Sequence, residues 1–310
     1  MRFAASEMPP LSATTINGRV HSVFRRVVNL RLDDGELLTL YANQDNSEPP
    51  GAITIPVPAD FDFSKHVALS AAISCRAGVL RIAGSGVSID LRRARRRNPE
   101  TVGPCRDGAD TGFSATWHSA WQTLLATDGA GLVAALHGRR PAGSLDTALA
   151  GRARQSVPQL LAAARAQDVD TAMSAAAQLI GAGPGLTPSG DDFLAGFLVG
   201  ARHTAQKKAE ITFLDALGRQ LPTQYGNSGD IACIYLAHAA AGRAAQPLIK
   251  LTRLITNGAT ARDTQASTVA AMQMGHSSGS DATFGILCGL TAWRRESTAQ
   301  ITVTPAEDTR

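Results

Sequence analysis

The glycine-rich string GAGPGLTPSGDD at residues 181–192 combines residue types that suit the binding of an anion. Thr187 and Ser189 carry hydroxyl donors, and Asp191 and Asp192 follow them closely. Glycine lets a ligand approach the backbone, and the first turn of a helix leaves N–H groups without partners at the positive end of its dipole. We therefore predict that this string binds phosphate or carboxylate at the start of a helix.

Two later segments repeat this chemistry. The sequences NSGDIACIYLAHAAAG at 227–242 and SSGSDATFGILCGL at 277–290 each place a Ser-Gly pair, and then an aspartate, before an apolar helix. If the three helix starts converge, they form a pocket. The predicted substrate-binding residues are Gly183, Gly185, Leu186, Thr187, Ser189, Gly190, Asp191, Ser228, Ser277, Ser278, Gly279 and Asp281.

Two other interpretations of these residues stay open. Ser189 with Asp192, and Ser278 with Asp281, have the spacing of a capping box, which would explain them without any ligand. Asp191, Asp192 and Asp281 could instead hold Mg²⁺ through their carboxylate oxygens. The string GAGPGLT follows a predicted helix rather than a strand, so a dinucleotide site is not expected.

His276 is the histidine that lies beside a glycine-serine cluster. Its imidazole could donate a hydrogen bond to an anion or shuttle a proton, which makes it a candidate catalytic residue. His118, His203 and His238 fall in helical runs, where we expect surface or core roles.

Composition and charge narrow the class of protein. The chain has 310 residues, a net charge of +4 and 44% hydrophobic residues, which is typical of a globular protein with a substantial core. Much of the positive charge lies in the run LRRARRRNPE at residues 91–100. No aromatic residues alternate with these arginines, so we interpret the run as an exposed edge, a subunit contact or a funnel for small anions, with nucleic-acid binding as the minor alternative.

Cysteine spacing and hydropathy exclude further classes. The four cysteines lack any CxxC spacing, so neither a zinc site nor a redox pair is predicted. The amino terminus lacks an apolar core of signal-peptide length, and no apolar run reaches the ~18 residues of a membrane span. We expect a cytoplasmic protein with no membrane partner.

Residues 1–100 are predicted to form a small β domain. The segment RVHSVFRRVVNLRL, the turn residues Asp33-Asp34-Gly35 and the segment ELLTLYA indicate a hairpin. The prolines of AITIPVPADF suit an edge strand, and two alternating runs flank Gly84-Ser85-Gly86. The β domain is expected to be barrel-like.

Residues 101–310 are predicted to form a larger all-α domain, which gives an α+β fold class overall. A linker, RRRNPETVGPCRDGAD, precedes a helix whose apolar face holds Phe113, Trp117, Trp121 and Leu124. Ser156 followed by Pro158 predicts a helix start, and DTAMSAAAQLI predicts a helix that stops at Gly181. The glycine pairs of residues 196 and 200, and of residues 285 and 289, predict close helix packing.

The strings GAGPGLTPSGDDFLAGFL and GHSSGSDATFGILCGL resemble the AllH-type subunit family of oxamate carbamoyltransferase, and VSIDLRRARR is similar to that family's segment at the end of the β region. The resemblance covers most of the chain. It implies partner carbamoyltransferase subunits, a small anionic substrate and no cofactor. The implied reaction exchanges a carbamoyl group between oxamate and phosphate, or serves a related ureido acid, in purine or ureide breakdown.

Under this resemblance, backbone amides and hydroxyl groups of the glycine-rich strings hold the anions of the substrate. Asp192 and Asp281 orient the loop or contact the amide NH₂ of the transferred group, which makes Asp192 the second predicted catalytic residue, beside His276. Two alternatives remain: an all-α hydrolase that uses Mg²⁺ held by the paired aspartates, and a non-catalytic scaffold or regulatory subunit.

Overall fold

The computed structural model describes residues 1–11, 16–43, 48–105, 112–126, 131–137 and 144–294. These residues divide into two compact units, the first spanning Met1–Glu100 and the second beginning at Thr101. Each unit has its own buried apolar core. Within the described residues, none of the helices combines the length and the apolar character needed to span a bilayer.

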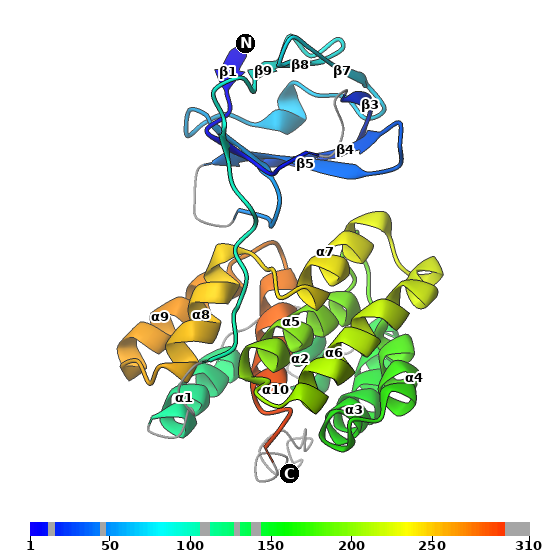
Figure 1. Ribbon diagram of the computed structural model, residues 1–310, viewed down its shortest axis with the longest axis vertical. Coiled ribbons are helices and arrows are strands. Elements are labelled where there is room, and N and C mark those ends of the chain that lie inside the picture. Colours follow the sequence, from blue (N-terminus) through cyan, green and yellow to red (C-terminus); the bar gives the residue numbers. More distant parts are fainter. Residues whose placement is uncertain (12–15, 44–47, 106–111, 127–130, 138–143, 295–310) are drawn as a thin grey trace. The chain divides into compact units, whose positions relative to one another are not determined.

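The first unit is a single curled β-sheet. Its strands are β1 (Arg2–Ala4), β2 (Glu7–Met8), β3 (Asn17–Val23), β4 (Val27–Leu32), β5 (Leu37–Asn43), β6 (Ile53–Pro56), β7 (Ala72–Arg76), β8 (Val79–Ile82), β9 (Ser88–Asp90) and β10 (Arg95–Arg96), with one 3-10 turn at Phe63–Lys65. The strand order is β1-β9-β8-β7-β3-β4-β5-β6-β2-β10. In Figure 1, β1, β9, β8 and β7 run along one side of this unit and β4 and β5 along the other, as expected of a half-barrel.

Turn chemistry and alternation of apolar residues explain most of this sheet. The predicted turn at Asp33-Asp34-Gly35 joins β4 to β5, and the turn at Gly84-Ser85-Gly86 joins β8 to β9. The segment at residues 19–32, which we predicted as one arm of a hairpin, is instead two strands that turn where the Phe24 N–H donates to the Val27 carbonyl. One strand of that length would extend roughly 45 Å, too long for so small a sheet.

Two further predictions for the first unit were wrong. Strand β6 is not an edge strand, because β5 and β2 flank it; Pro56 is tolerated as its last residue. The predicted linker begins too early, because Arg95 and Arg96 form strand β10 beside β2. The edges of the sheet are therefore β1 and β10.

The second unit is helical. Its helices are α1 (Phe113–Ala126), α2 (Leu132–His137), α3 (Ser144–Ala166), α4 (Val169–Leu179), α5 (Ser189–Thr204), α6 (Lys208–Gln220), α7 (Asp230–Ala240), α8 (Gln246–Thr256), α9 (Ala261–Met272) and α10 (Ser278–Leu290), with a 3-10 segment at Leu221–Asn227. Helices α5 and α10 lie in the middle, with α8 and α9 on one side and α3 and α4 on the other (Figure 1). The predicted α+β fold class is confirmed.

Local sequence accounts for most of these helices. The predicted face of α1, with Phe113, Trp117, Trp121 and Leu124, is buried. Helix α4 begins after the cap Asp168, and it ends before Gly181, the residue at which the sequence predicts its stop. The predicted helix start near Ser156 is wrong, because α3 runs through Pro158. Proline inside a helix costs about 3 kcal/mol, and the complete burial of neighbours such as Val157 and Leu160 offsets that cost.

Candidate functional site

Helices α5 and α10 cross so closely that only glycine fits at the crossing. A Cβ atom added to Gly196 would lie 2.0 Å from the Ala282 carbonyl oxygen, and one added to Gly285 would lie 2.0 Å from the Phe193 carbonyl oxygen. The contact is reciprocal, because each glycine meets the residue three positions before the other glycine. The predicted packing role of these glycines is confirmed.

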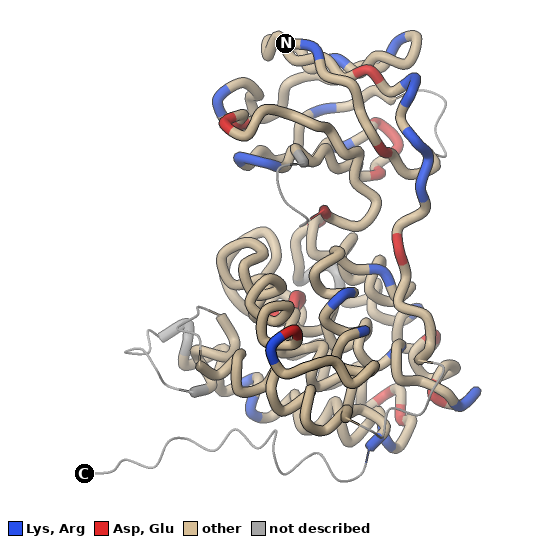
Figure 2. Tube along the Cα trace, turned by 90° about the vertical axis from the view of Figure 1, so that its left-hand side faces the viewer, with Lys and Arg blue, Asp and Glu red and all other residues tan. Residues whose placement is uncertain are grey.

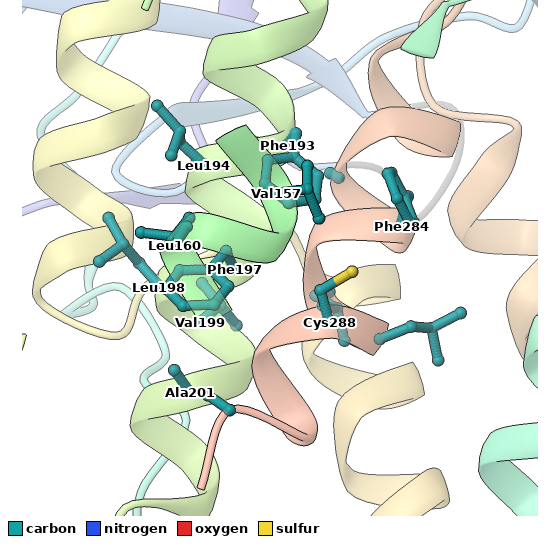
Figure 3. Packing of buried hydrophobic residues seen from close by; sticks show 14 of the residues in the cluster. Val157, Leu160, Phe193, Leu194, Phe197, Leu198, Val199, Ala201, Phe284 and Cys288 are labelled. Carbon is teal, nitrogen blue, oxygen red and sulfur yellow. The ribbon is translucent and has the colours of Figure 1, made fainter. Parts of the chain in front are cut away.

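The two helices run in the same direction. One turn beyond Gly196, a Cβ at Gly200 would lie 2.5 Å from the Ile286 carbonyl oxygen, so the contacts advance together along both helices. Apolar side chains surround the crossing, and the rings of Phe193 and Phe284 lie 5.1 Å apart (Figure 3). A parallel crossing of this kind brings the two predicted anion-binding starts together.

At these joined starts, each helix offers a serine to the aspartate of the other. The Ser278 hydroxyl of α10 faces Asp192 of α5, and the Ser189 hydroxyl of α5 faces Asp281 of α10. Thr187, just before α5, lies 2.9 Å from Ser278 between the two hydroxyl oxygens. The repeated Ser-Gly strings therefore form one reciprocal cluster.

The start of α2 completes the surroundings of Asp281. The Leu132 backbone N–H donates to Asp281 Oδ1 over 2.6 Å. Gly131 has a φ of +93°, and a Cβ there would lie 2.4 Å from Asp281 Oδ2. Glycine is thus required at this position, both by the backbone conformation and by the closeness of the carboxyl group.

Asp191 is held by two other segments. Its Oδ2 accepts a hydrogen bond of 3.0 Å from the Gly181 backbone N–H and one of 2.8 Å from the Ser228 hydroxyl. Ser228 precedes α7, so the third Ser-Gly string does reach the cluster. It does so through its serine, because Asp230, its aspartate, is exposed.

The three carboxyl groups are buried, with exposed fractions of 2% for Asp191, 7% for Asp192 and 0% for Asp281. One oxygen of each has no hydrogen-bond partner among the described residues: Oδ1 of Asp191, Oδ2 of Asp192 and Oδ2 of Asp281. An unpaired buried acceptor is costly, so such atoms point to a missing donor. The cluster thus contains three buried acceptor oxygens that are unpaired among the described residues.

Burial raises the pKa of all three carboxyl groups, since a charged carboxylate loses its hydration there. The pKa of Asp192 rises to about 8, with the Ser278 hydroxyl opposing the rise and the charge of Asp281 adding to it. The pKa of Asp281 rises to about 7, opposed by Ser189 and the Leu132 amide. The pKa of Asp191 is also raised by burial, against Ser228 and Gly181. Neutral carboxyl groups are therefore available near neutral pH.

The capping-box interpretation is wrong for both helices. The cap of α5 is Pro188 and the cap of α10 is Ser277, and neither makes a side-chain cap hydrogen bond. Ser189 and Ser278 lie inside the helices, one residue too late to cap them. Their hydroxyl groups turn instead to the aspartates of the opposite helix.

Two of the predicted backbone donors are already used within the chain. The Gly190 N–H donates to the Ala182 carbonyl and the Gly279 N–H donates to the Met274 carbonyl, each over 2.9 Å. The exposed part of the first string is the loop of Gly183, Pro184, Gly185 and Leu186. Carboxyl and hydroxyl groups, rather than these two backbone amides, are therefore the candidate ligand-binding groups of the cluster.

His276 lies on the exposed turn before α10. None of the interactions described for the cluster joins its imidazole to Asp192 or Asp281. Its neighbour Ser277 does face Asp281. His276 is therefore at the rim of the cluster rather than in contact with the carboxyl groups.

Several groups near the cluster carry no sequence signal of their own. The amides of Gly181 and Leu132 act through backbone geometry, which side-chain patterns do not reveal. The pKa of Tyr235, a residue of α7, is raised to about 12 by burial and by the charge of Asp192. From the sequence, a tyrosine inside an apolar helix is expected to pack in the core. Its closeness to Asp192 depends on the fold and could not be predicted from the sequence of α7.

In the described parts of the chain, no group of three or more histidine, cysteine, aspartate or glutamate residues has the arrangement of a metal site. The alternative in which Asp191, Asp192 and Asp281 hold Mg²⁺ gains no support from this arrangement. The four cysteines are free thiols.

The arginine run contrasts with this cluster. Asp90 pairs with Arg92 and Arg2, and Glu7 pairs with Arg95 and Arg97, all near the surface of the first unit. The arginines lower the pKa of Asp90 and of Glu7. This part of the run is an exposed network of ion pairs.

The fold and the site define a two-unit α+β protein whose helical unit buries a cluster of carboxyl and hydroxyl groups. Two family models match it: the one described as oxamate carbamoyltransferase subunit AllH over residues 179–290, and the AllH family N-terminal domain over residues 3–96. The chain belongs to the AllH family, as the resemblance in the sequence predicts. A search of curated proteins and a search of solved structures returned no match.

Proposed function

We propose that this chain is a subunit of a carbamoyltransferase that acts on oxamate and oxalurate, or on a related ureido acid, in purine or ureide catabolism. In the oxamate case, phosphate takes the carbamoyl group from oxalurate, and oxamate and carbamoyl phosphate are formed. The match to a family of oxamate carbamoyltransferase subunits supports the reaction class and the presence of partner subunits.

One observation carries the proposal: open carboxyl oxygens lie where the two signature strings of the matched region meet. Amide and carbamoyl groups carry N–H donors, which need such acceptors when they are taken from water. Asp192 and Asp281 are the proposed partners of the transferred NH₂ group. Ser189, Ser278 and Thr187 hold those carboxyl groups in place.

The exposed loop at residues 183–186 is proposed to meet the carboxylate of oxamate, with backbone N–H groups as donors. His276, at the rim, is proposed to handle the proton of the leaving nitrogen. These roles place the carboxylate of oxalurate outside the buried cluster and its terminal carbamoyl group inside.

The test is phosphorolysis of oxalurate by this chain purified with its partner carbamoyltransferase subunits, followed as carbamoyl phosphate formed. Asp192→Asn and Asp281→Asn should each lower kcat/KM by about 100-fold, because the carbamoyl group loses its fixed position. Asp230→Asn, at the exposed start of α7, is the matched control and should keep full activity. Full activity in both cluster variants, in an assembled complex, would contradict the proposal.

A further inference from the structure

The segments that build the cluster contain no lysine or arginine. Residues 166–201, 220–242 and 263–293 hold the three Ser-Gly strings, the helices α7 and α10 and all of α5 except its last turn, and none of these residues is a lysine or an arginine. Arg202 lies in the last turn of α5, at the end away from the cluster. Long stretches of the helical trace in Figure 2 accordingly carry no blue, the colour of lysine and arginine. Residues 131–137, which include α2, also lack both.

Phosphate is a poor ligand for such surroundings. Proteins bind it with arginine, lysine, metal ions or unpaired amides at helix starts. Here the amides of Gly190 and Gly279 are paired with Ala182 and Met274. Three aspartates occupy the same place, and any that is ionised repels a phosphate across a low-dielectric interior.

The unpaired oxygens of the cluster are hydrogen-bond acceptors, whereas phosphate needs hydrogen-bond donors or cations. Each aspartate presents one buried oxygen without a partner among the described residues, and each of these oxygens can accept a hydrogen bond. An uncharged carbamoyl NH₂ supplies two donors and no charge. It can therefore fill acceptor positions without a counter-ion, whichever aspartate is ionised.

We propose that the cluster of Asp191, Asp192 and Asp281 is a subsite for the uncharged carbamoyl group and excludes phosphate. This inference rests on the proposed function and specifies which part of the substrates the cluster takes. The transferred group enters the cluster, while the phosphate oxygens stay beyond the rim.

The experiment is a calorimetric competition on the wild-type full-length chain. N-methylurea is the uncharged carbamoyl probe and inorganic phosphate is the anion, with ionic strength kept constant by sodium chloride. N-methylurea is expected to bind, and phosphate is expected to leave its affinity unchanged within twofold. The variant Asp192→Asn should bind N-methylurea about tenfold more weakly, because one acceptor of the pair becomes an amide.

Two results would overturn the inference. One is competition, in which phosphate weakens N-methylurea binding to the wild type more than twofold at constant ionic strength. The other is absence of N-methylurea binding to the wild type. Asp230→Asn should behave as the wild type. Either of these two results could be obtained while the Asp192 and Asp281 variants still lose oxalurate phosphorolysis. In that case this subsite assignment would be rejected and the proposed function would stand.

Discussion

The starts of α5 and α10 differ from the start of α7, although all three follow a Ser-Gly string. Asp192 and Asp281 are buried against each other's helices, whereas Asp230 is exposed. The difference follows from the glycines four residues apart in α5 and α10, which α7 lacks. A shared motif thus becomes a buried acidic cluster only where the helices behind it can cross closely.

The largest predicted effect comes from breaking that crossing. Gly285→Val places a branched side chain where the Phe193 carbonyl oxygen is 2.0 Å away from the added Cβ. We expect a loss of more than about 4 kcal/mol in the free energy of unfolding, measured by urea denaturation.

The matched control for this change is Gly151→Ala, inside α3, where an added Cβ meets nothing within 4 Å. It should raise stability by about 0.5–1 kcal/mol, because alanine favours a helix. A Gly285→Val variant that unfolds at the wild-type urea concentration would show that the crossing is not as close as described.

The second prediction concerns pH. The Asp192 carboxyl stays neutral in the folded chain up to about pH 8, while in the unfolded chain it ionises near 3.9. Its contribution to stability is therefore complete below pH 3.9 and is lost as pH rises to about 8. The loss has a limiting slope of about 1.4 kcal/mol per pH unit.

Asp192→Asn should flatten this slope and be more stable than the wild type at pH 8. Urea denaturation between pH 4 and 8 measures both effects. Asp230→Asn, at the exposed start of α7, is the control variant for this measurement. An unchanged slope in Asp192→Asn would mean that Asp192 is ionised throughout this range.

The smallest predicted effect tests the reciprocity of α5 and α10. Ser189→Ala and Ser278→Ala each remove a hydroxyl that faces the aspartate of the other helix, and each should cost about 1–2 kcal/mol at pH 7. Ser228→Ala should cost less than Ser189→Ala, because Ser228 is half-buried whereas Ser189 is only 3% exposed. Thermal unfolding measures all three, and costs for Ser189 and Ser278 that differ by more than about 1 kcal/mol would contradict the reciprocal arrangement.

Periodicity and turn residues were enough to predict the fold class, the face of α1 and the turn between β4 and β5. They failed at Pro158, where burial of the surrounding residues outweighs the local cost of proline. They also failed at β6, because the short strand β2, which covers it, comes from a distant part of the chain. Local rules cannot include such contacts.

The candidate site was predicted only in part. The Ser-Gly strings indicated convergence, and Asp191, Asp192 and Asp281 do gather with Ser189, Ser228 and Ser278. The sequence could not indicate that the Ser189 hydroxyl faces Asp281 rather than Asp192, because the partner of Ser189 depends on how α5 and α10 cross. Nor could it indicate that the carboxyl groups, rather than the glycine amides, would be left with open positions.

The most direct measurement of the central claim is a crystal structure of the chain with oxalurate. The terminal carbamoyl nitrogen of oxalurate should lie within about 2.7–3.2 Å of carboxyl oxygens of Asp192 and Asp281, with its carboxylate toward residues 183–186. Oxalurate bound by its carboxylate inside the cluster, or bound instead at the arginine run of the first unit, would contradict the account.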